Sequence, residues 1–215
     1  MKDKVIRIII CIVIAITLLF GVTVGAAFAV RHMRAVIKLG DITVDYSTIT
    51  YVASFYKMKY IEKHDHEGAG DTEEFWNTLT DTGITHAEDY EAEFKDFLCG
   101  VVAEAYLYIT YHGYTAEDKL AVAKKSESVL REYANGSVEE FNRIAEPYGF
   151  DYDDFQNADA LFYKSEKAAE LLPATLGQQE YESKLAEARE KVVFNKLYDA
   201  IDLISVPIIN DYYVR

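Results

Sequence analysis

The sequence contains few of the residues that usually cross-link or interrupt small folded domains. Among 215 residues there are two cysteines, three prolines and one tryptophan. Cys11 lies inside an apolar run, so Cys99 is the single cysteine of the remaining chain and no disulfide can form within that part. Stability must therefore come from a packed core. The scarcity of proline is typical of long helices, because proline interrupts them.

Catalytic signatures and positive charge are also scarce. The sequence contains no glycine-rich phosphate loop, no Gly-x-Ser-x-Gly nucleophile elbow and no His-Glu-x-x-His zinc motif. Asp and Glu number 36 against 22 Lys and Arg, which gives a net charge of −14. A surface this acidic excludes general binding to the phosphates of nucleic acids. The sequence therefore predicts no enzyme, no cofactor and no nucleic acid partner.

One long apolar run is present, from Ile8 to Val30, and its 23 residues carry no charge. A helix of this length spans about 35 Å, which exceeds the hydrocarbon core of a bilayer, about 30 Å. A cleaved signal peptide, cut near Ala27–Ala29, is the alternative, but the length of the run favours an uncleaved signal anchor. A large domain after a first apolar segment is normally translocated. We therefore expect a cytoplasmic stub and membrane anchor (residues 1–34) and an extracytoplasmic domain (residues 35–215) on a single-pass protein of the cell membrane.

The residues after the anchor predict a small β element. Val36–Leu39 and Ile42–Val44 are short β-type runs, and Gly40-Asp41 between them suits a type II′ turn. A lone hairpin of this size is marginally stable in water, so we expect a third strand. Its best candidate is Ile204–Ile209, where Pro207 would require an edge position or a bulge.

Between the two chain ends the apolar spacing is helical. Thr85–Glu88 and Thr115–Asp118 have the pattern of capping boxes, in which side chains satisfy the free N–H groups at a helix start. The main predicted helices cover approximately residues 47–63, 85–112, 115–133, 137–147, 158–172 and 178–203. The sequence thus predicts a mainly α domain with a small β element formed by both chain ends.

The first predicted helix, Ser47–Lys63, has apolar residues on two nearly opposite faces. Such a helix is either packed between two layers or presents one face to a partner. Tyr51, Phe55 and Met58 form one of these faces and are our candidate peptide-binding residues. Trp76 is a further candidate.

Two histidines, His64 and His66, follow this helix in a polar segment that also contains Glu62 and Glu67. Imidazole and carboxylate groups can bind zinc or a similar ion. A metal site also needs rigid elements that fix its ligands, and this segment shows none, so a solvated loop is the favoured interpretation. Metal binding at His64 and His66 is the alternative.

Three segments, taken in order, resemble parts of a known family. Val36–Asp45 resembles a strand–turn start, with Leu39-Gly40-Asp41 in place of Asn-Gly-Glu. Ala103–Thr115 looks like a helix that ends in Gly-hydrophobic-Thr, and Phe141–Leu172 is similar to a lobe segment that contains Gly-hydrophobic followed by a helix. Together they resemble the N-terminal, peptide-binding domain of the SurA/PrsA-type foldases and, more distantly, the peptide-binding part of trigger factor.

This resemblance implies a helical domain that binds extended, apolar peptide segments in a cleft between lobes. In that family a parvulin prolyl-isomerase domain of about one hundred residues commonly follows the helical lobe. Here only Pro173–Gln179 separate Leu172 from the last predicted helix, so no isomerase activity is implied. We therefore expect a membrane-anchored, chaperone-like module that binds unfolded or extended polypeptide. The alternative is a dedicated interaction subunit that binds one folded partner within a membrane complex.

Overall fold

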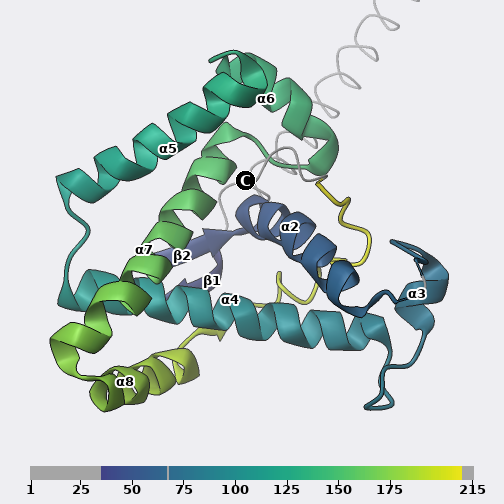
Figure 1. Ribbon diagram of the computed structural model, residues 1–215, viewed down its shortest axis with the longest axis horizontal. Coiled ribbons are helices and arrows are strands. Elements are labelled where there is room, and N and C mark those ends of the chain that lie inside the picture. Colours follow the sequence, from purple (N-terminus) through teal and green to yellow (C-terminus); the bar gives the residue numbers. More distant parts are fainter. Residues whose placement is uncertain (1–34, 67, 210–215) are drawn as a thin grey trace, which may run out of the picture. The chain divides into compact units, whose positions relative to one another are not determined.

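The computed structural model describes residues 35–66 and 68–209 (Figure 1). The predicted membrane anchor, Ile8–Val30, lies outside these residues. Within them, no helix has both the length and the apolar composition that crossing a bilayer requires. The described residues belong to one compact unit that begins at Ala35.

The unit begins with the predicted β-hairpin. Strand β1 (Ala35–Leu39) pairs antiparallel with β2 (Ile42–Asp45), and Leu39 lies opposite Ile42 across the turn. Gly40 has φ +56°, the left-handed conformation that the first central residue of a type II′ turn needs. A Cβ at this position would lie 2.8 Å from the Tyr106 ring. Both the backbone conformation and the available space therefore require glycine.

The third strand is β3 (Val193–Phe194), so the sheet order is β2-β1-β3. β3 runs antiparallel to β1 and places Phe194 opposite Ile37. The backbone N–H of Asn195 extends the contact by donating to the Val36 carbonyl at 3.0 Å. A late segment of the chain thus completes the sheet that the start of the domain opens.

The prediction that Ile204–Ile209 forms this strand is wrong. The Lys57 ammonium donates hydrogen bonds to the carbonyls of Ile204 (2.6 Å) and Val206 (3.0 Å), where a strand would have used backbone N–H groups. Pro207 lacks an N–H and could not have donated a hydrogen bond to a ladder. The segment packs as irregular chain instead, with bends at Ile204–Val206 and with Val206 and Ile209 buried in the core.

Helices make up most of the described chain, and the prediction of a mainly α domain with a small sheet is confirmed. The α-helices between β2 and β3 are α2 (Tyr46–His64), α3 (Glu73–Asn77), α4 (His86–Tyr111), α5 (Ala116–Ala134), α6 (Val138–Ala145), α7 (Tyr152–Leu176) and α8 (Gln178–Glu190), with a 3₁₀ turn η1 (Glu146–Tyr148) after α6. The predicted last helix, residues 178–203, is too long. It ends at Glu190, because the β-type residues after Lys191 leave the helix and enter β3.

Helix α4 lies at the centre of the packing and contacts α2, α3, α7, α8 and the hairpin. Figure 1 shows it running across the whole described unit, with α8 below it and α7 crossing above. Its inward side chains are fully buried: Tyr90, Phe94, Leu98, Val102 and Ala105. Helix α5 packs against α7 and α6. This arrangement leaves a space between α2, α4, α5, α7 and α8 that their side chains only partly fill.

Candidate functional site

A cavity of about 590 Å³ opens between α2, α4, α5, α7 and α8. Ligand pockets in proteins typically have volumes of about 300–1,000 Å³. The residues that line the cavity are Tyr51, Val52, Phe55, Lys59, Asp96, Phe97, Gly100, Val101, Glu104, Lys125, Val129, Phe155, Asp159, Phe162, Ser165, Glu166 and Arg189. Apolar and aromatic residues supply about half of this lining, and charged residues supply most of the rest.

The apolar part of the lining is held in place by ring contacts between helices. The Tyr51 ring of α2 packs edge-on against Phe155 of α7, with ring centroids 5.8 Å apart. Phe97 of α4 faces Phe162 of α7 at 6.1 Å. These rings come from three helices and lock one another in position, so the apolar surface of the cavity is formed before any ligand binds.

The charged part of the lining contains both signs. Lys125 of α5 pairs with Asp159 of α7 at 2.5 Å, and Arg189 of α8 pairs with Asp96 of α4. The Lys125 and Asp96 side chains are 60% and 74% exposed, whereas their partners Asp159 and Arg189 are 6% and 32% exposed, so each pair combines one solvent-facing and one more enclosed charged group. A ligand with its own N–H and C=O groups could therefore find both donors and acceptors here.

Glu104 is a more enclosed carboxylate of the same lining. It accepts hydrogen bonds from the Ser165 hydroxyl and from the Tyr181 hydroxyl, the latter at 3.4 Å. Burial and the adjacent Glu104 carboxylate raise the pKa of Tyr181 to about 12, so this hydroxyl stays protonated and keeps donating at neutral pH. Glu104 therefore joins α4 to α7 and α8, and we assign it a structural role.

The structure brings two of the four predicted peptide-binding residues into this cavity. Phe55 lines it as a half-buried ring and Tyr51 as a ring buried in its wall (6% exposed), whereas Met58 is partly buried elsewhere on α2 and is not among the lining residues. Trp76 is only 4% exposed and stacks on Tyr60 with ring centroids 5.9 Å apart, so its ring belongs to the core and is not accessible to a peptide.

Sequence reasoning missed the contribution of α4 and α7 to the cavity. Phe97 and Phe162 lie on helical stripes whose pattern is that of ordinary core residues. Whether such a ring is covered or faces a cavity depends on the distance between helices, which periodicity does not specify. No signal in the sequence distinguishes the two cases.

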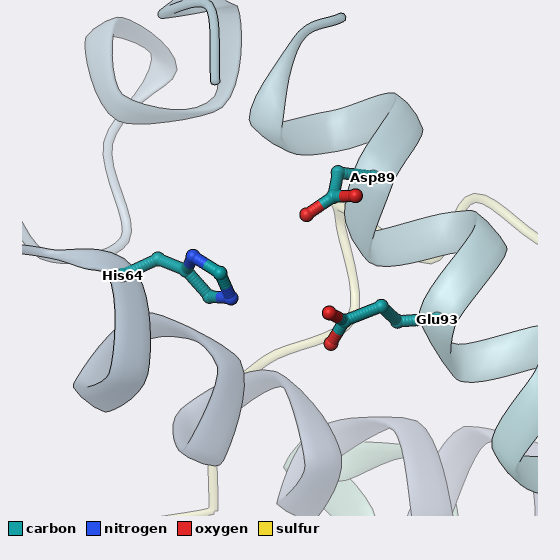
Figure 2. A group of neighbouring side chains, drawn as sticks. All are labelled: His64, Asp89 and Glu93. Atoms are coloured by element: carbon teal, nitrogen blue, oxygen red, sulfur yellow. The ribbon is translucent and has the colours of Figure 1, made fainter. Parts of the chain in front are cut away.

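A second group of side chains surrounds His64, the last residue of α2 (Figure 2). The imidazole faces Asp89 and Glu93, which lie one turn apart on α4, and one ligand atom from each residue lies within 4.8 Å of the others. His66, the other histidine considered above, is exposed in the following loop. The structure thus pairs His64 with carboxylates of a distant helix and not with its neighbours in sequence.

No protein-family model, no curated protein and no solved structure matches this chain. The resemblance to the SurA/PrsA-type foldases therefore stays a prediction.

Proposed function

We propose that this protein is a membrane-anchored, extracytoplasmic chaperone-like module that binds segments of unfolded or extended polypeptide in the cavity between α2, α4, α5, α7 and α8. The observation that carries the proposal is the composition of the lining, an apolar and aromatic surface beside charged groups of both signs. The module binds and releases its clients without changing them chemically, and it has no prolyl-isomerase activity.

Extended polypeptide has the chemistry that this lining would recognise. Its apolar side chains can pack on rings such as Phe55, Phe97 and Phe162, while its backbone N–H and C=O groups need polar partners when they leave water. Lys125, Arg189 and their carboxylate partners supply such groups at the same cavity. A purely apolar pocket would leave the backbone of a bound peptide unsatisfied.

The proposed location is supported by the sequence before Ala35. The charge-free run Ile8–Val30 has the length of a membrane-spanning helix, and the acidic composition of the chain suits a domain that must remain soluble beside a membrane. An anchored binding module of this kind would act on chains that emerge at the membrane surface.

The test is suppression of aggregation by the purified full-length protein. Chemically denatured citrate synthase is diluted into buffer with and without the protein, and light scattering is followed. We expect slower aggregation at equimolar ratio. Phe55→Glu, which places a charge in the cavity, should abolish most of the effect. Leu120→Glu is the matched control, because Leu120 is 55% exposed on α5 and is not among the lining residues.

The proposal fails if the protein does not slow aggregation, or if the two variants behave alike while both retain the wild-type circular dichroism spectrum. A photo-crosslinker at position 97 provides an independent readout, since clients in the cavity should react there. Reaction with one stoichiometric protein in cell membranes, and not with denatured chains, would instead support a dedicated interaction subunit.

A further inference from the structure

A cluster outside the cavity carries a separate inference. We propose that His64, Asp89 and Glu93 form a binding site for one divalent transition-metal ion, with Zn²⁺ as the probe. The ion would join the end of α2 to the first turns of α4. This proposal does not depend on the function of the cavity.

The geometry of the three side chains is that of ligands around a gap. Their nearest nitrogen and oxygen atoms all lie within 4.8 Å of one another. The His64 Nε2 atom is buried and has no hydrogen-bond partner among the described residues, so the imidazole and the carboxylates do not simply bond to each other. Ligands that share an ion at about 2.0–2.2 Å can lie up to about 4.4 Å apart. A shift of about half an ångström would therefore bring all three into coordination distance.

The residue types match the preferences of zinc. Imidazole nitrogen and carboxylate oxygen are both zinc ligands, and Asp89 and Glu93 are spaced four residues apart, which places them on one face of α4. Three protein ligands leave a fourth position for water. Figure 2 shows the His64 ring projecting from α2 toward the two carboxylates on the facing helix.

Neighbouring groups hold the proposed ligands in place. The Tyr60 hydroxyl donates to Asp89 Oδ2 at 2.8 Å, and the Tyr60 ring stacks on the His64 ring with centroids 4.4 Å apart. Such outer contacts fix the orientation of metal ligands.

One cation already competes for the site. Lys63 Nζ lies 2.9 Å from Glu93 Oε1, but the lysine side chain is 61% exposed and can swing into water. Binding of a divalent ion would release it. Replacement of Lys63 by a neutral residue should therefore strengthen metal binding, whereas replacement of a ligand should weaken it.

The experiment measures zinc binding to the untagged, purified full-length protein at pH 7.5 by competition with a chromophoric chelator. We expect one Zn²⁺ per chain and a higher melting temperature with zinc than without. His64→Gln and Glu93→Gln should each weaken binding at least tenfold, and Lys63→Gln should strengthen it. His66→Gln is the matched control, because His66 is an exposed histidine two residues away, and its affinity should stay within twofold of wild type.

The inference is overturned if the wild-type protein binds no stoichiometric zinc, or if His64→Gln and Glu93→Gln both bind as tightly as wild type. It is also overturned if His66→Gln loses as much affinity as His64→Gln, since that would place the ion in the loop. Circular dichroism of each variant without metal identifies any that fail to fold. Because the ligands are on two helices, Glu93→Gln tests the site even if His64→Gln does not fold.

Discussion

Lys57 is the buried cation of the domain core, and its replacement by methionine provides the sharpest test of the fold. The side chain is 1% exposed. Its ammonium donates to Asp71 Oδ2 at 2.8 Å and to the carbonyls of Ile204 and Val206. All three N–H groups are thus used, and together they join α2 to two other parts of the chain, the segment before α3 and the Ile204–Ile209 segment. Methionine has a similar length and removes only the charge and the donors.

The cost of Lys57→Met follows from what it leaves behind. Two buried carbonyls lose a donor, and the Asp71 carboxylate loses its counter-charge. Removing one partner of a buried ion pair costs about 3–5 kcal/mol of unfolding free energy. Asp71 is 33% exposed and can be partly hydrated, so we expect the lower part of this range, about 3 kcal/mol. For a domain of this size that corresponds to a fall in melting temperature of roughly 6–12 °C.

The assay is urea unfolding followed by tryptophan fluorescence. Trp76 is the one tryptophan of the chain, and its indole N–H donates to Asp71 Oδ1 at 2.7 Å, so the probe reports on the same contact. Lys63→Met serves as the control, because that lysine is exposed and its loss should cost less than about 1 kcal/mol. A loss below about 1 kcal/mol for Lys57→Met would refute the idea that this lysine fastens the C-terminal segment to α2.

Further predictions concern the hairpin, a buried carboxyl group and the proposed metal site. Gly40→Ala should lower the free energy of unfolding by about 1–2 kcal/mol because of the left-handed backbone, and by more because the new Cβ would meet the Tyr106 ring. Gly83→Ala, at φ +84° with nothing within 4 Å, should show the backbone cost only. Equal losses for the two variants in urea unfolding would contradict this. Burial raises the pKa of Asp154 to about 6, against hydrogen bonds from Ser47 and from the Asp151 N–H. Ionisation of Asp154 therefore opposes folding, so the contribution of Asp154 to stability should fall by roughly 1–3 kcal/mol as pH rises from about 4 to 7, measured as the difference between the pH profiles of the wild type and Asp154→Asn. Tyr60→Phe, which removes the hydroxyl bound to Asp89, should weaken zinc binding about tenfold in the chelator assay, and unchanged affinity would argue against its positioning role.

The local features of the fold follow from sequence chemistry. The capping boxes at Thr85 and Thr115 form as predicted, since a hydroxyl and a carboxylate three residues apart satisfy the free N–H groups of one helix start. Gly40 turns the hairpin because it alone accepts the required backbone conformation. Each of these depends on residues within five positions of one another, so no knowledge of the rest of the chain is needed.

Features that depend on distant partners could not be predicted in the same way. Val193–Phe194 is too short to stand out from the helix before it, and it becomes a strand only because the edge of β1 is available. Ile204–Ile209 has the composition of a strand, but its Ile204 and Val206 carbonyls accept hydrogen bonds from the Lys57 ammonium and not from a neighbouring strand. His64 was considered with His66 because they are close in sequence, whereas the structure places it beside Asp89 and Glu93.

Helix α2 shows why its sequence pattern allowed two interpretations. Tyr51 and Phe55 line the cavity, Lys57 holds the C-terminal segment, and Tyr56 stacks on Phe97 of α4 at 4.7 Å. Because α2 has a packing partner on each of three sides, the pattern of polar residues in its sequence does not show which side faces the cavity. Packing between layers and exposure of one face to a ligand are therefore both compatible with its pattern, and they occur on different faces of the same helix. The cavity and the proposed metal site both depend on α2. Substitutions at Phe55 and at His64 should nevertheless affect peptide binding and zinc binding independently, because the two residues lie more than two helical turns apart.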